Sequence, residues 1–415
     1  MKREKGNSVF LVVGFVTIFT FLALSAPAYA QREKFVIGSA IAHTGKFARE
    51  GANLKKAYDL WAQMVNGQGG IEVKGKKYPV EIIYYDDKSD PQTTTRLVEK
   101  LITEDKVDLI FGPFSSDCVG PSSTITEKYK VPMIESAGNA TPIFQRGFKY
   151  LFCTLLLAED QPQAFMRMFA QMSPKPKTVA VIAPKSPFYL SSAKGFKKYA
   201  EKYGFEVVHE ETYPAEMEDI TPILQKVKAK NPEILCVGSH TLVAMMIMKQ
   251  SKEIDFNPRA YCFSFGVRTP EFSKELGKDA EYAMEYSYIS LKAPFKDSLY
   301  GTTRQFFETF KKKYGIEPDG TLQGATVGGI AVQVAIQKAG LTPPLTEEKR
   351  IKLRDELSKL DIVTSAGPVR FDPTGINVAN PLSIFQIQKG VPVCVDPKDW
   401  SEASLIYPAP KWKSR

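Results

Sequence analysis

Histidines and catalytic motifs are scarce in this sequence. Only three histidines, His43, His209 and His240, occur in 415 residues, and none is followed by residues that support a catalytic triad. The motifs G-x-S-x-G, G-x-x-x-x-G-K-[ST] and H-E-x-x-H are absent, and the stretch His209-Glu210-Glu211 lacks a second histidine. The sequence therefore predicts no enzyme, no metal site and no cofactor.

Cysteine is also sparse and unpatterned. The five cysteines are Cys118, Cys153, Cys236, Cys262 and Cys394, and no C-x-x-C pair occurs among them. Their odd number and wide spacing argue against a disulfide framework and against a zinc site. Cys236 and Cys262 lie in apolar runs typical of strands, where a small buried residue is the default interpretation. Oxidation of one pair outside the cytoplasm stays open, because the sequence does not indicate which cysteines would pair.

Long apolar runs are absent except at the start of the chain. The basic segment MKREK precedes the apolar run 9–26 and the sequence PAYA, which has small residues at Ala28 and Ala30. This layout is typical of a secretory signal peptide cleaved after Ala30. An uncleaved membrane anchor is the alternative, because about 18 apolar residues nearly span a bilayer. We expect residues 1–30 to be removed and the mature protein to be soluble and exported.

The excess of basic residues is not organised for binding nucleic acid. The chain has a formal net charge of +9, and the loss of residues 1–30, with three basic residues and one acidic residue, leaves +7. Lysine pairs at 55–56, 76–77 and 197–198 are scattered, and no basic stripe is interleaved with aromatic residues. The sequence predicts no nucleic-acid partner, and this charge supports only a mild attraction for anions near the surface.

The chain does contain a regular alternation of strand and helix patterns. The first series has strands at 34–42, 78–87, 107–112 and 131–136, with helices at 51–70, 91–104 and 117–129. The second series has strands at 178–184, 205–211, 233–239 and 259–265, with helices at 188–203, 219–230 and 241–253. This order predicts an α/β fold of two doubly wound parallel-sheet halves, with a ligand cleft where their strand C-termini face each other. Helices at 300–314, at 324–340 and after 342–350, and a strand at 383–390, complete the chain.

The stretch FGPFSSDC, residues 111–118, presents two serines where a buried strand ends and a helix begins. A helix N-terminus leaves its first amides unpaired and attracts an anion. If the helix starts near Ser116, the serine hydroxyl and the loop ESAGNA, with Gly138 and Asn139, would form a carboxylate-sized site. The alternative is that Ser115 and Ser116 merely cap the helix, and the spacing alone leaves both interpretations open.

Several segments in order resemble the leucine/isoleucine/valine-binding group of periplasmic solute-binding proteins, the receptors of ABC importers. The resemblance runs from Lys34 to the end and is carried by IGSAIAHTGKFAREG with VNGQGGI, DDKSDPQTTTRLVEKLITEDKVDLIFGPFSS, VPMIES and FCTLLLAEDQPQAF. It implies a type I periplasmic binding fold, in which two α/β lobes joined by three crossovers close over a small ligand. It also implies a periplasmic monomer whose partner is an ABC permease in the inner membrane.

Predicted crossovers divide the chain into these lobes. They lie near Leu155, near Ser287 and after the segment GPVRFDPTG at 367–375. Lobe one is expected to comprise residues 31–155 and 288–371, and lobe two residues 156–287 and 372–415.

The resemblance also assigns ligand-binding roles. It places the ligand carboxylate at Ser116, Ala137 and Asn139, where Asn139 replaces a usual threonine. Phe114 matches an apolar pocket residue, and Phe188 matches an aromatic residue of the second lobe. The predicted ligand-binding residues are Ser116, Ala137, Asn139, Phe114, Phe188, His240, Phe265 and Glu50.

Departures from the family pattern bear on the ligand. The family holds the ligand ammonium with two acids, and the matching positions are Ala158 and Phe265, although Glu159 and Asp160 lie close to the first. A buried ammonium without an acidic partner costs several kcal/mol. This comparison favours an apolar or aromatic carboxylate over a zwitterion.

The expected cleft is rich in aromatic residues, namely Phe114, Phe188, Phe263 and Phe265. His240 and Glu50 each stand where the family commonly has an aromatic residue. The sequence predicts the extracytoplasmic receptor of an ABC importer that captures a small carboxylate, either a branched-chain or hydrophobic amino acid or an apolar or aromatic acid. An exported sensing module of the same fold, feeding a separate signalling receptor, is the alternative.

Overall fold

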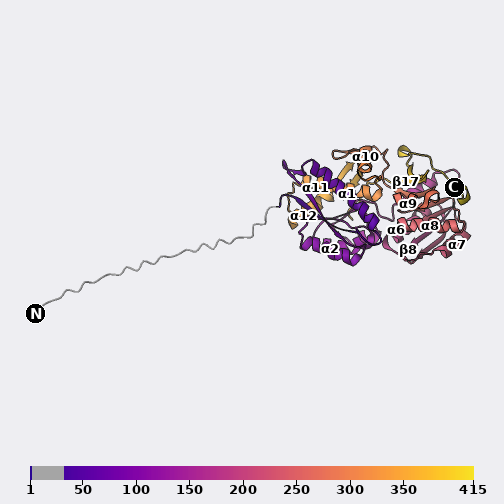
Figure 1. Ribbon diagram of the computed structural model, residues 1–415, viewed down its shortest axis with the longest axis horizontal. Coiled ribbons are helices and arrows are strands. Elements are labelled where there is room, and N and C mark those ends of the chain that lie inside the picture. Colours follow the sequence, from indigo (N-terminus) through magenta and orange to yellow (C-terminus); the bar gives the residue numbers. More distant parts are fainter. Residues whose placement is uncertain (2–31) are drawn as a thin grey trace.

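The computed structural model describes Met1 and residues 32–415, so the expected signal peptide lies outside the described residues. Among the described residues, no helix is long and apolar enough to cross a membrane. Figure 1 shows two lobes side by side, one with α1, α2, α11 and α12 and the other with β8 and α6 to α9. The indigo start and the orange late part of the chain share the first lobe, so the chain passes between the lobes more than once.

A five-stranded parallel sheet forms the centre of the first lobe. In spatial order its strands are β4 (Val80–Asp86), β1 (Phe35–Ile41), β5 (Leu109–Phe111), β6 (Met133–Glu135) and β7 (Leu151–Cys153). The order reverses between β1 and β5, and ligands of doubly wound sheets bind at the strand C-termini beside such a reversal. The predicted parallel α/β architecture is confirmed in this lobe.

Helices from two distant parts of the chain cover this sheet. They are α1 (Ala48–Gly67), α2 (Pro91–Thr103), α3 (Ser116–Lys128), α4 (Thr141–Phe144), α10 (Thr303–Tyr314), α11 (Gly320–Ala339) and α12 (Glu347–Leu357). The sequence sets where α2 begins, because the Asp90 carboxylate accepts a 2.7 Å hydrogen bond from the Thr93 amide and Pro91 occupies the first turn. Helices α1 and α11 pack closely because Gly329 leaves room for the Trp61 ring.

Three small hairpins lie beside the first lobe's core. They are β2 (Ile71–Val73) with β3 (Lys76–Tyr78), β13 (Lys296–Asp297) with β14 (Gly301–Thr302), and β15 (Asp361–Thr364) with β16 (Gly367–Arg370). The hairpin at 71–78 was not predicted from the sequence.

A seven-stranded mixed sheet forms the centre of the second lobe. In spatial order its strands are β9 (Glu206–Tyr213), β8 (Thr178–Pro184), β10 (Ile234–Val237), β11 (Ala260–Phe263), β12 (Ala283–Ser287), β17 (Ser383–Gln388) and β18 (Val391–Asp396). The first five are parallel, whereas β17 pairs antiparallel with β12, and β18 antiparallel with β17.

The second lobe's helices pack on both faces of this sheet. They are α5 (Gln163–Ala170), α6 (Pro187–Lys202), α7 (Thr221–Ala229), α8 (Thr241–Glu253) and α9 (Pro270–Leu276), with 3-10 turns η1 (Gly277–Ala280), η2 (Lys398–Trp400) and η3 (Trp412–Ser414). All five cysteines are buried and unpaired, and Cys236 and Cys262 are direct neighbours on β10 and β11.

Three chain segments cross between the lobes and contact one another. The Leu156 amide in the first segment donates a 3.1 Å hydrogen bond to the Tyr288 hydroxyl in the second. Asn380 in the third donates to the Thr154 carbonyl at 2.8 Å. Ile376 pairs with Cys153 at the edge of the first sheet, so the third segment leaves lobe one later than the predicted boundary at residue 371.

Candidate functional site

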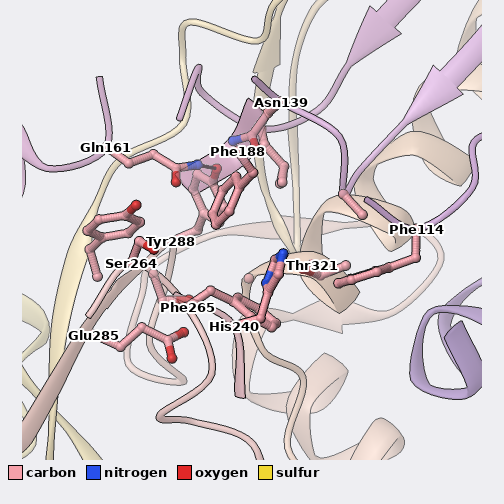
Figure 2. A pocket seen from close by; sticks show the side chains of 15 residues that line it. Phe114, Asn139, Gln161, Phe188, His240, Ser264, Phe265, Glu285, Tyr288 and Thr321 are labelled. Carbon is pink, nitrogen blue, oxygen red and sulfur yellow. Dashed lines mark hydrogen bonds between the residues drawn. The ribbon is translucent and has the colours of Figure 1, made fainter. Parts of the chain in front are cut away.

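A small cavity lies between the lobes at the C-terminal ends of the strands (Figure 2). It encloses about 40 Å³. Its lining comes from lobe one, from the crossovers and from lobe two, and comprises Phe114, Ala137, Asn139, Leu155, Gln161, Phe188, His240, Ser264, Phe265, Glu285, Tyr286, Ser287, Tyr288, Gly320 and Thr321. A cavity of about 150 Å³ accommodates benzene. A ligand of that size therefore requires the lobes to part or the lining side chains to move.

Aromatic rings from both lobes surround His240 at this cavity. The imidazole stacks on Phe188 with a centroid distance of 4.8 Å and an interplanar angle of 7°. Phe114 of lobe one lies 5.6 Å from the His240 ring, and Phe265 of lobe two lies 5.4 Å from it. Burial lowers the pKa of His240 to about 3, with Lys46 as a smaller cause, so the ring is neutral near pH 7. One side of the cavity is therefore apolar, uncharged and aromatic.

Polar groups from the loop after β6 and from the first and second crossovers hold one another at the opposite side. The amides of Asn139 and Gln161 both donate to the Leu156 carbonyl, at 2.6 Å and 3.1 Å. Gln161 also donates to the Tyr288 hydroxyl at 2.5 Å. These bonds fix the side chains of Asn139 and Gln161 at the cavity wall.

A buried carboxyl group, Glu285, lines the cavity from lobe two. Its Oε2 accepts hydrogen bonds from the backbone amides of Val267 at 2.7 Å and Arg268 at 3.0 Å. Burial raises the pKa of Glu285 to about 7, against the lowering effect of Arg268 and of these amides. The adjacent Tyr286 hydroxyl is buried without a hydrogen-bond partner in the described part of the chain.

Six of the eight predicted ligand-binding residues line this cavity, namely Phe114, Ala137, Asn139, Phe188, His240 and Phe265. Ser116 does not. Its hydroxyl accepts a 3.1 Å hydrogen bond from the Ala140 amide, and it lines a separate cleft of about 650 Å³ between α3 and α6. The amides of Ala137 and Gly138 in the expected anion loop donate to the buried Glu135 carboxylate instead.

The remaining acids named from the sequence also point elsewhere. Glu159 pairs with Lys194 at 3.0 Å, and Asp160 accepts from the Tyr199 hydroxyl at 2.7 Å, so neither lines the cavity. Phe263 is fully buried in the core of lobe two. Its expected place in the cleft is wrong.

Glu50 lies at a contact between the lobes, beside a smaller adjoining cavity. Its Oε1 accepts a 3.1 Å hydrogen bond from the Thr241 hydroxyl at the start of α8. Burial raises the pKa of Glu50, and the Thr241 bond and Arg49 lower it in part. Ser186 donates to Asp117 across the same interface at 3.0 Å. These contacts hold the lobes in a closed arrangement.

Sequence reasoning missed Gln161, Glu285 and Tyr288, which the crossovers and β12 contribute, and Thr321 at the start of α11. One signal for Glu285 was present, because β12 reads AMEYS and is buried throughout. A charged residue inside a fully buried strand is rare unless it is paired or functional. Among the described residues, no group of three or more histidine, cysteine and acidic side chains is placed to hold a metal ion.

A family model described as periplasmic binding protein matches residues 34–391. The Leu/Ile/Val-binding protein homolog 8 of Brucella suis biovar 1 is 25% identical over 401 residues, covering 93% of this chain and 96% of the relative. Homolog 7 of the same organism is 24% identical over 314 residues, covering 73% and 76%.

Solved structures share the fold. The branched-chain amino acid binding protein LivJ of Streptococcus pneumoniae, in complex with isoleucine, has a TM-score of 0.74 at 21% identity, covering 90% of this chain and 100% of that one. A solute-binding protein of Rhodopseudomonas palustris in complex with benzoate has a TM-score of 0.73 at 18% identity, covering 89% and 98%. A solute-binding protein of Rhodopseudomonas palustris BisB5 in complex with 3,4-dihydroxybenzoic acid has a TM-score of 0.74 at 23% identity, covering 92% and 100%.

Proposed function

Because the chain belongs to the periplasmic binding protein family, we propose that it is the extracytoplasmic receptor of an ABC importer and captures a small carboxylate by lobe closure. The predicted resemblance to the leucine/isoleucine/valine-binding group and the predicted type I fold are confirmed. The chain is a binding protein and not an enzyme.

One observation carries the proposal: the cavity is walled by both lobes at once. Phe114 comes from lobe one, and Phe188, His240 and Phe265 come from lobe two. A ligand between these rings would contact both lobes only when they are closed, so its binding energy would favour the closed state. This coupling is what a receptor needs to signal to a permease that it is loaded.

We assign the apolar part of the ligand to the aromatic side of the cavity. Phe188, the neutral His240 and Phe114 line this side and offer apolar contacts to a ring or a branched aliphatic group. The carboxylate is assigned to the wall formed by Ala137 and Asn139, as the family resemblance implies. The structural neighbours contain isoleucine, benzoate and 3,4-dihydroxybenzoic acid, so the same fold serves both chemical types of ligand.

We further propose that the protein acts as a periplasmic monomer after cleavage at Ala30 and delivers its ligand to a permease in the inner membrane. Size-exclusion chromatography with light scattering measures the oligomeric state. N-terminal sequencing of the exported protein would begin at Gln31 if the cleavage site is right.

A thermal-shift screen tests the ligand class. The purified protein is heated with leucine, isoleucine, phenylalanine, small aliphatic acids and benzoate derivatives. A ligand at about 100 times its Kd adds about 2.7 kcal/mol of stability, which raises Tm by a few degrees for a chain of this size. The variant Phe188→Ala should lose most of the shift. A screen in which no carboxylate raises Tm, or in which Phe188→Ala responds like the wild type, would contradict the proposal.

A further inference from the structure

Among the described residues, Glu285 is the one acidic side chain that lines the cavity, and its surroundings are costly for a carboxylate. It is 1% exposed and lies on β12, whose five residues are all buried. Figure 2 shows its carboxylate directed toward Phe265 and His240 at the cavity floor. Burial of a carboxylate costs several kcal/mol unless hydrogen bonds or an opposite charge compensate it.

The compensation seen in the structure is incomplete. The two backbone amides from Val267 and Arg268 both donate to Oε2, and no hydrogen bond within the described part of the chain reaches Oε1. The Arg268 guanidinium forms no ion pair with Glu285 there. It donates to the Ser287 hydroxyl at 2.6 Å and packs 3.8 Å above the Phe385 ring. One carboxylate oxygen is therefore left for a donor that enters the cavity.

The wider charge pattern favours a donor over an acceptor at this end. Asp319, the N-terminal cap of α11, is a buried acid whose negative charge raises the pKa of Glu285. Arg268 is the cation that offsets them, and it is engaged by other partners. A second ligand acceptor placed here would face repulsion, whereas an N–H or O–H group would be attracted.

We propose that Glu285 is a specificity-determining residue that accepts a hydrogen bond from an ammonium or hydroxyl group on the ligand. This inference rests on the proposed function and narrows it to carboxylates that carry a hydrogen-bond donor. It also brings back the zwitterions that the sequence comparison disfavoured, alongside carboxylates that carry a hydroxyl group. That comparison weighed the positions of Ala158 and Phe265 and the nearby Glu159 and Asp160, whereas the structure supplies an acid from β12.

Selectivity against ligands without a donor follows from the buried oxygen. A ligand that fills the cavity without donating to Glu285 leaves the carboxylate oxygen desolvated and unpaired. Sites built to hydrogen-bond a ligand N–H or O–H can reject the analogue that lacks it by about 10⁴- to 10⁵-fold. We expect at least about 100-fold discrimination here.

Isothermal titration with two matched ligand pairs tests the inference. The pairs are phenylalanine with 3-phenylpropionate and 4-hydroxybenzoate with benzoate, whose members differ only in the donor. The donor-bearing member of the pair that fits the cavity should bind wild type at least about 100-fold more tightly, and Glu285→Gln should reduce this preference below about 10-fold. The responding pair identifies the donor as ammonium or hydroxyl.

A matched control is Glu127→Gln, because Glu127 likewise accepts from two backbone amides, of Lys149 and Tyr150, both at 2.9 Å, but does not line the cavity. It should keep the wild-type preference. Glu285→Asp, which keeps the charge, should retain part of the preference and serves if Glu285→Gln does not fold. If the wild type binds both members of the pair that fits the cavity with equal affinity, the role of Glu285 is overturned and the proposed function stays intact. Absence of binding by all four ligands in a protein that binds no other carboxylate would instead refute the proposed function, and the inference with it.

Discussion

The hydrogen bond between Thr241 and Glu50 joins the two lobes, so removing it should weaken lobe closure. Thr241 is fully buried at the start of α8 in lobe two, and Glu50 is 8% exposed on α1 in lobe one. Their oxygens are 3.1 Å apart. The substitution Thr241→Val keeps the shape and removes the hydroxyl, so it removes a bond that exists only when the lobes are closed.

The size of the effect follows from the environment of Glu50. A buried acceptor that loses its partner costs about 1–3 kcal/mol. In the open protein water solvates the Glu50 carboxylate, so this cost falls on the closed state alone. Because ligand binding requires closure, the apparent affinity should fall by about 5- to 150-fold.

Isothermal titration with any ligand found in the thermal-shift screen measures this loss of affinity. Small-angle scattering should also show a larger radius of gyration for unliganded Thr241→Val than for unliganded wild type. Thr241→Ser retains the hydroxyl and should bind within a few-fold of wild type. If Thr241→Val binds as tightly as wild type, the bond with Glu50 does not stabilise closure and the reasoning fails.

Four further predictions concern other parts of the molecule. Ser116→Ala should change ligand affinity less than about 3-fold, because Ser116 lines the neighbouring cleft and its hydroxyl bonds to the Ala140 amide and not to the ligand cavity. A 10-fold or larger loss in titration would restore the carboxylate role predicted from sequence. Burial raises the pKa of Glu285 from its ordinary 4.5 to about 7 in the folded state, so ionisation of Glu285 destabilises the folded state as pH rises from about 4.5 to 7. In urea unfolding, the free energy of unfolding of Glu285→Gln relative to wild type should therefore increase by up to about 3 kcal/mol between pH 5 and pH 8. A slope with pH that is equal in both proteins would contradict this assignment. Gly329→Ala places a methyl group against the Trp61 ring and should cost about 1–3 kcal/mol in the same assay, whereas Gly67→Ala, with open space around it, should be close to neutral; equal stabilities would refute the packing argument. The five buried cysteines should resist a thiol reagent in the native protein and all react after denaturation, and fewer than five reactive thiols would show that a pair had oxidised.

Elements of the fold were predictable wherever a local pattern contains the whole signal. The apolar run at 178–184 and the helical pattern at 241–253 coincide with β8 and α8. The hairpin of β2 and β3 was missed because each strand has three residues and its turn, with Lys74 and Gly75 at positive φ, lies in a polar segment. Such short strands form because they pair with each other, and they are too short to show a hydrophobic periodicity in the sequence.

The candidate site was predictable only in part. Ala137 and Asn139 follow a buried strand, and the C-terminal ends of parallel strands meet at one edge of a sheet, so their place at the cavity follows from the sequence. The direction of the Ser116 hydroxyl could not be predicted from the sequence, because its partner is the Ala140 amide of a loop 24 positions away. Glu285 reaches the cavity because the crossovers pack together. This packing brings Leu156 and Tyr288, which are 132 positions apart in the sequence, into hydrogen-bond contact.

A small carboxylate is expected to bind between the aromatic rings of the two lobes. Isothermal titration of the best ligand from the screen, repeated at several temperatures, measures this binding. We predict one ligand per chain, a negative heat-capacity change from burial of apolar surface, and at least a 10-fold loss of affinity in Phe188→Ala. Binding that shows no heat-capacity change and is unaffected by Phe188→Ala would place the ligand elsewhere and contradict the account.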